Sequence, residues 1–237
     1  MSKLPRLALL FSVIASLAAC GGGGGSAGSA PPIQAPDLGD VNVANAWHNY
    51  LTTPQTWDMP GKAADGTVFQ VTVQLKPAAA SAFPVSGASS QTTGQAFRFS
   101  FNTTGGVDRN DTFYFNGDNV LGVVSAATGE CGVARAVMPA LPAAGSLGSN
   151  GALFVLDNYD ACATRKVSGG TSTVNWSIDT DAGVTMFCLT TYEDNAKGVR
   201  ISTEVDCVEV DRAGTLGTKA KFALTLADGR SLVGRNF

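Results

Sequence analysis

The sequence contains a single histidine, His48, in 237 residues, and this scarcity limits the chemistry that the chain can carry out. A Ser-His-Asp mechanism would have to run through His48, which needs a nucleophile and a carboxylate beside it. The alternative S-x-x-K arrangement of a serine nucleophile does not occur. His48 lies on the polar side of an expected helix, where a solvated or structural role is the simpler interpretation. We therefore predict no catalytic centre and no cofactor.

Charged residues are also scarce, at 15% of the chain, against about a quarter in typical soluble domains. The 16 lysines and arginines form no cluster, whereas a nucleic-acid-binding protein presents a basic stripe to the phosphates. The formal net charge is −3. This composition excludes nucleic acid as a partner and suits an exported β protein.

Cysteines are few, and none of the five belongs to a C-x-x-C motif. Four lie in the body of the chain, at Cys131, Cys162, Cys188 and Cys207. An even number of cysteines in an exported domain predicts two disulfides. Zinc binding is the competing interpretation, but the wide spacing of the cysteines and the distance of His48 in the sequence weigh against it. No metal site is expected. Three connectivities are open, and we favour Cys131 with Cys162 and Cys188 with Cys207 because these pairs close the shorter segments.

Long hydrophobic runs are absent, and the longest apolar stretch follows the basic residues Lys3 and Arg6 at the start of the chain. It extends from Leu7 to about Ile14, which is too short for a membrane-spanning helix of about 20 residues. Small residues follow it up to Ala19. This arrangement is typical of a secretory signal peptide.

The four residues Leu17-Ala18-Ala19-Cys20 resemble the lipobox of bacterial lipoproteins. The resemblance implies cleavage after residue 19, a lipid on Cys20, and membrane anchoring through that lipid. Residues 20–40 are rich in Gly, Ser and Pro and would form a flexible tether with a span of about 25 Å. In this family an aspartate after the cysteine favours the inner membrane, and Gly21 stands there, so the resemblance implies the outer membrane, facing either side.

Residues 41–237 are expected to form one domain that is nearly all-β and antiparallel. Asn42 is expected to cap a short helix whose apolar face holds Val43, Ala46, Trp47, Tyr50 and Leu51, and which ends before Pro54. Strict alternation of apolar and polar residues then predicts half-buried strands within 67–76, 95–102, 111–116, 172–179, 198–207 and 219–226. Turn pairs at Asp65-Gly66, Asn116-Gly117, Ala182-Gly183 and Asp228-Gly229 predict hairpins. The pattern allows a β-sandwich or a small β-barrel.

Two stretches, 77–94 and 138–150, are rich in small residues and proline and fit no element, so they are expected to be surface loops. A further stretch gathers oxygen donors that could hold calcium: Asp108, Asn110, Asp111, Asn116 and Asp118. It lacks the glycine and glutamate of an EF-hand loop, and turn formation is the preferred explanation. Glu204 and Glu209 are expected on the solvated face of their strand.

For function, three classes remain open. The preferred one is a non-catalytic envelope lipoprotein whose β domain binds an envelope protein or has a structural role. The second is a lipocalin-like carrier of a small apolar ligand, although the G-x-W signature is missing and only Gln55-Thr56-Trp57 stands nearby. The third is a hydrolase that uses Asp or Glu, which requires carboxylates that converge in a cleft.

Overall fold

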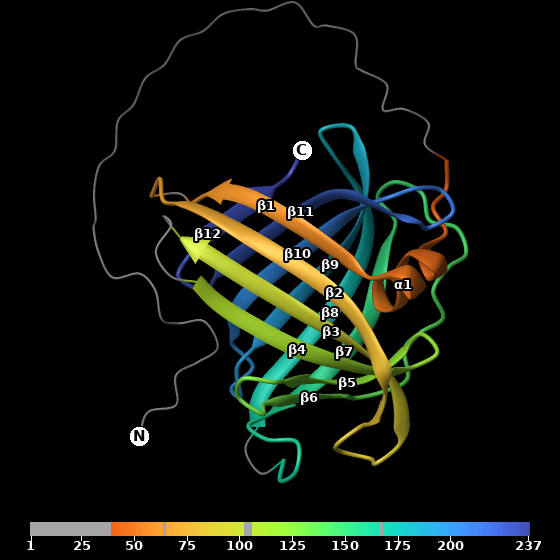
Figure 1. Cartoon of the computed structure of the whole chain (residues 1–237), viewed down its shortest axis with the longest axis vertical. Coiled ribbons are helices and arrows are strands. Elements are labelled where there is room, and N and C mark those ends of the chain that lie inside the picture. Colours follow the sequence, from red (N-terminus) through yellow and green to blue (C-terminus); the bar gives the residue numbers. More distant parts are fainter. Residues whose placement is uncertain (1–38, 64, 102–105, 166–167) are drawn as a thin grey trace, which may run out of the picture. The chain divides into compact units, whose positions relative to one another are not determined.

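The computed structural model describes residues 39–63, 65–101, 106–165 and 168–237. Cys20 and most of the expected tether lie outside these residues, so lipidation stays a prediction. The described chain begins with one helix, α1 (Val43–Thr52), and continues as twelve strands (Figure 1). The strands are β1 (Gln55–Lys62), β2 (Val68–Ala82), β3 (Ser89–Phe101), β4 (Gly106–Asn116), β5 (Asn119–Ser125), β6 (Cys131–Ala134), β7 (Asn150–Tyr159), β8 (Ser168–Asp181), β9 (Val184–Asp194), β10 (Arg200–Val210), β11 (Leu216–Leu226) and β12 (Ser231–Arg235).

The strands form one closed antiparallel barrel in which each strand pairs with its neighbours in the sequence. The all-β, antiparallel expectation is therefore confirmed, and the barrel is the architecture found. All four predicted turn pairs connect consecutive strands. Their glycines have positive φ, as tight hairpin turns require, with Gly117 at 56° and Gly183 at 79°.

Alternating side chains fill the barrel interior, as the strand patterns predict. On β2 the residues Phe69, Val71, Val73 and Leu75 are buried in the main core, and on β3 Phe97 and Phe99 join them. Rings from β3 and β11 contact one another there, since Phe99 and Phe222 meet edge to face with centroids 5.4 Å apart. We call Phe97, Phe99 and Phe222 the aromatic wall.

Helix α1 covers one end of the barrel (Figure 1). Its five predicted apolar residues are all buried, and the Asn42 side chain accepts a hydrogen bond from the Asn45 amide, so the predicted cap is confirmed. Side-chain hydrogen bonds fix the helix to turns at this end: the Trp47 indole donates to the Asp118 carbonyl at 2.8 Å, and the Asn49 amide donates to the Gly214 carbonyl at 2.8 Å. The helix is therefore part of the barrel core.

Both favoured disulfides are present, Cys131–Cys162 and Cys188–Cys207. The second joins directly paired positions of β9 and β10. It lies in a small cluster apart from the main core, with Val184 and Met186. The second disulfide therefore reinforces the sheet without occupying the lumen.

One of the two expected loops was predicted wrongly. Residues 77–94 extend β2 and β3 into a long hairpin, which Figure 1 shows in yellow below the barrel. Phe83 at its turn is buried and packs against the Tyr114 ring at 5.2 Å between centroids. That contact holds the hairpin, whose strands consist mostly of small residues, against β4. The other stretch, 138–150, is largely a loop, and it reaches β7 only at Asn150.

The barrel closes at a narrow seam where β1 and β12 share one register pair, Gly61 and Gly234. A Cβ at Gly61 would lie 2.4 Å from the Phe69 ring and 2.5 Å from the Val233 carbonyl oxygen. We expect Gly61→Ala to lower the free energy of unfolding by about 2–3 kcal/mol, because the buried Phe69 ring and the paired backbone must both shift. Chemical denaturation measures this change.

The matched control is Gly94→Ala in β3, where the nearest atom to a new Cβ is 3.7 Å away. That substitution should change stability by less than about 0.5 kcal/mol. Equal effects of the two substitutions would show that closure of the barrel at Gly61 is not tight.

Candidate binding site in the barrel lumen

An arginine bridges the barrel lumen from β4 to β10, which lie half-way round the barrel from each other. The Arg109 guanidinium donates from Nη1 to Oε2 and from Nη2 to Oε1 of Glu204, both at 3.0 Å. Such a bidentate pair is among the strongest and most directional contacts between side chains. The strand alternation places both residues on inward positions, opposite Phe97 of β3 and Leu224 of β11.

Asp111 and Phe97 complete the surroundings of the guanidinium. Asp111 Oδ2 lies 3.2 Å from Arg109 Nε, and the guanidinium carbon lies 4.0 Å above the Phe97 ring centroid. Carboxylates and an aromatic face both attract a cation. Although burial disfavours its charge, the carboxylates of Glu204 and Asp111 hold the pKa of Arg109 above its ordinary value.

Asp206 stands two residues after Glu204 on the same inward face of β10. Burial raises the pKa of Asp206 well above its ordinary value, and the neighbouring Glu204 carboxylate raises it further through charge repulsion and a hydrogen bond between the two groups. Two adjacent carboxyl groups that share one proton behave in this way. We call Arg109, Asp111, Glu204 and Asp206 the charged cluster.

Tyr50 connects the charged cluster to α1. Its hydroxyl accepts a hydrogen bond of 2.8 Å from Gln95 Nε2 on β3. Burial, then the nearby Asp206 and Glu204, raise the pKa of the Tyr50 hydroxyl well above its ordinary value. The helix that covers the barrel end therefore places a neutral, polar group next to the carboxyl pair.

Water reaches the charged cluster although the barrel surrounds it. The Arg109 side chain keeps 31% of its surface accessible and that of Asp111 keeps 17%. Other polar groups also face the lumen: Asn158 donates to Ser172 Oγ at 2.8 Å, and Ser125 is paired with Asp111 in the sheet. Part of the charged cluster is thus accessible, whereas the rings of the aromatic wall beside it are buried.

This cluster corrects the expectation for Glu204, which is 9% exposed and not solvated. The sequence signal was obscured because Glu204 and Asp206 alternate with Val205 and Cys207, which suggested that the apolar positions face the core. The structure instead buries Cys207 in the cluster of its disulfide. Glu209, on the other face, is half-exposed and lies 3.5 Å from Lys219 Nζ.

His48 does not belong to the lumen site. Its Nδ1 lies 2.8 Å from Asp118 Oδ1, and both side chains are exposed. The nearby Thr52 hydroxyl donates to the His48 backbone carbonyl and not to the ring. This pair fastens α1 to the β4–β5 turn.

The oxygen donors considered for calcium do not converge. Asp108 faces Arg98 on the neighbouring strand, Asp111 faces the lumen, and Asp118 contacts His48. Across the described part of the chain, no group of three or more His, Cys, Asp or Glu residues has a metal-binding arrangement. The tryptophans Trp47, Trp57 and Trp176 are buried in the core.

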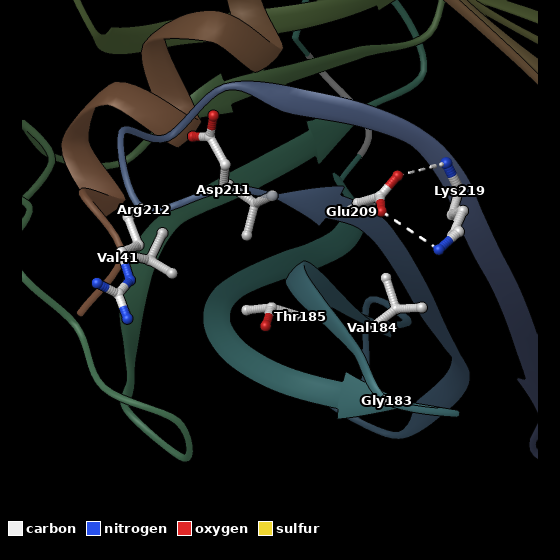
Figure 2. Close-up of a pocket in the computed structure, with 9 residues that line it drawn as sticks. Val41, Gly183, Val184, Thr185, Glu209, Asp211, Arg212 and Lys219 are labelled. Atoms are coloured by element: carbon white, nitrogen blue, oxygen red, sulfur yellow. Dashed lines mark hydrogen bonds and ion pairs between the residues drawn. The ribbon is translucent and has the colours of Figure 1, made fainter. Parts of the chain in front are cut away.

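A separate hollow of about 330 Å³ lies near the start of β9 and the end of β10 (Figure 2). Glu209 and Lys219 line it side by side, and the dashed lines in Figure 2 join them. The Glu209 carboxylate also accepts hydrogen bonds from the Thr218 and Lys219 amides.

The described residues contain no helix long enough and apolar enough to cross a membrane, since α1 spans only ten residues. No protein-family model matches the chain, and no curated protein and no solved structure is significantly similar to it.

Proposed function

We propose that this chain is a lipoprotein anchored in the bacterial outer membrane through Cys20, and that its barrel is a non-catalytic binding module. The lipobox residues, the tether and the even set of disulfide cysteines support export and anchoring. The observation that carries the binding role is the charged cluster, in which Arg109 holds Glu204 through two hydrogen bonds inside a lumen that water reaches. A perturbed cluster in a concave interior is a candidate recognition site.

The position of Arg109 favours recognition over catalysis. A general base must be free to accept a proton from a substrate, and both oxygens of Glu204 are engaged by the guanidinium. The cluster also argues against the apolar carrier. An apolar ligand in contact with Arg109 and Asp111 would remove water from them without replacing its hydrogen bonds, which is unfavourable.

A hydrolase remains the second candidate because two carboxyl groups, Glu204 and Asp206, lie on the same inward face of β10, and burial raises the pKa of Asp206 well above its ordinary value. One protonated and one ionised carboxyl group is the minimum for acid–base hydrolysis. A screen of the full chain against ester, glycoside, peptide and phosphate substrates separates the two candidates. Turnover that disappears in Asp206→Asn, with the fold intact, would favour the hydrolase.

Anchoring is tested by Cys20→Ser. We expect the variant to lose all labelling by a fatty-acid analogue and to move from the membrane fraction to the soluble fraction, since no thiol remains at the lipobox for the lipid. Metabolic labelling and fractionation measure both effects. A variant that stays labelled and membrane-bound would refute the lipoprotein proposal.

A further inference from the structure

The hollow near the start of β9 has walls that are hydrogen-bonded to the rest of the barrel. On one side Val41 exchanges two backbone hydrogen bonds with Gly145, at 2.9 and 2.8 Å. The next residue, Asn42, donates its amide to the Arg212 carbonyl at 3.0 Å. Gly183 of the β8–β9 turn lines the hollow away from Val41 (Figure 2). The hollow of about 330 Å³ is therefore a fixed feature of the fold.

Both carboxylates that line the hollow are engaged by backbone amides of the β10–β11 connection. The register between β10 and β11 shifts, so that Glu209 alone stands opposite residues 217–219. Its Oε2 accepts hydrogen bonds from two amides of that segment, at 3.2 and 3.3 Å. The Asp211 side chain points away from Thr185 in Figure 2, and its Oδ1 accepts a hydrogen bond from the Thr215 amide at 2.8 Å. These two carboxylates therefore stabilise the connection itself.

The two cationic side chains of the hollow have more hydrogen-bond donors than this lining uses. Arg212 and Lys219 lie on opposite sides in Figure 2, with Thr185 between them. Within the described residues the Lys219 ammonium, which can donate three hydrogen bonds, contacts only Glu209 Oε1, at 3.5 Å. A guanidinium carries five donors in a planar fork that fits a carboxylate. The hollow thus presents donors from both sides.

Thr185 provides a third donor, and it is independent of the charged groups. It lines the hollow from β9, and its Oγ1 is buried with no hydrogen-bond partner in the described part of the chain. Buried hydroxyls are normally paired. The residue as a whole is half-buried, and rotation about χ1 exchanges the hydroxyl with the methyl group. The Thr185 hydroxyl can therefore turn to donate to an acceptor that enters the hollow.

We propose that this hollow is a second binding site, outside the lumen, that takes a small carboxylate between Arg212 and Lys219. The ligand accepts hydrogen bonds from these two side chains and from Thr185. Its single charge suits the lining, where two carboxylates balance two cations. A doubly charged phosphate loses more hydration, and this lining has no net positive charge to compensate that loss. The site goes beyond the proposed function of the lumen and does not depend on it.

The test is a nitrogen-15 NMR titration of the full chain with acetate at constant ionic strength. Neutral acetamide, methylammonium and phosphate are the comparison probes. We expect acetate alone to shift the amide signals of Gly183 and Thr185 in a saturable way. Arg212→Gln should weaken acetate binding about tenfold, as the loss of a charged hydrogen-bond donor implies. Thr185→Val removes only the hydroxyl function and should weaken binding several-fold.

Glu209→Gln distinguishes a carboxylate site from a general effect of surface charge. The new amide oxygen can still accept hydrogen bonds from the two β11 amides, while the negative charge beside Lys219 is removed. We therefore expect acetate to bind about threefold more tightly to this variant, because one like charge near the ligand is gone. If the variant does not fold, Lys219→Gln serves instead and should weaken binding several-fold.

The matched control is Arg135→Gln, which removes an exposed arginine that pairs with Asp157 and does not line the hollow. It should leave acetate binding unchanged.

Four results would overturn the inference. Equal shifts with acetamide, or tighter binding of phosphate or methylammonium, would assign another ligand class. The absence of a saturable shift at Gly183 and Thr185 would refute a site in the hollow. Weaker acetate binding to a folded Glu209→Gln, or equal losses in Arg212→Gln and Arg135→Gln, would reduce the effect to surface charge. The lumen proposal stands apart from these results, because the substrate screen decides it.

Discussion

Glu204→Gln should lower the free energy of unfolding by about 3 kcal/mol. The substitution leaves the Arg109 guanidinium in the lumen without its bidentate partner, which is the costly way to break a buried ion pair. The expected loss lies at the lower end of the range for such pairs because 31% of the Arg109 side chain contacts water. Chemical denaturation at neutral pH measures it.

The control is Asp157→Asn, which breaks the exposed pair between Asp157 and Arg135 on the barrel surface. Exposed pairs contribute less than about 1 kcal/mol, so this variant should remain close to the wild type. Adding Arg109→Gln to Glu204→Gln should cost less than the sum of the single changes, by about 1–3 kcal/mol. Additive losses would show that the two residues do not interact across the lumen.

We expect Asp206→Asn to raise the free energy of unfolding by about 1–3 kcal/mol at neutral and alkaline pH. This is the usual cost of a buried polar group whose lost contacts with water are not fully replaced. The folded state binds the Asp206 proton more tightly than the unfolded chain, where the ordinary pKa of 3.8 applies. Wild-type stability therefore falls, relative to the variant, as pH rises above 3.8, and the difference becomes constant above the raised pKa of the folded state. Below both values the two proteins should be equally stable.

Denaturation of both proteins across the pH range measures this difference directly. The comparison is made between variant and wild type because lowered pKa values elsewhere, such as that of Asp181 beside Lys221, contribute a slope of the opposite sign in both proteins. A variant that is less stable than the wild type at alkaline pH would contradict the raised pKa of Asp206.

The sequence predicts the local structure of this protein better than its architecture. Alternation identifies the strands with one apolar face, such as β2 with Phe69 and Val71, and glycine turns identify their connections. The alternation rule fails for β9, because both faces of this strand are apolar. Met186 and Cys188 pack in the small cluster around the second disulfide, while Phe187 and Leu189 fill the main core. Barrel closure depends on one pairing between the first and last strands, which no local pattern encodes.

The charged cluster could not be predicted for a related reason. Arg109 and Glu204 are 95 residues apart, and only the closed barrel brings their strands to opposite sides of one lumen. Each residue by itself resembles a solvated charge on a strand. The disulfides were predictable because they follow from the cysteine count and from short loop closure, and neither depends on the architecture.

The account depends on a carboxyl group, Asp206, whose pKa is raised by burial in the barrel lumen and by the neighbouring Glu204. Carbon-13 NMR titration of the side-chain carboxyl groups of the full chain tests this claim most directly. The account predicts that Asp206 titrates well above 3.8 in the folded protein. Titration of Asp206 near its ordinary value would contradict it.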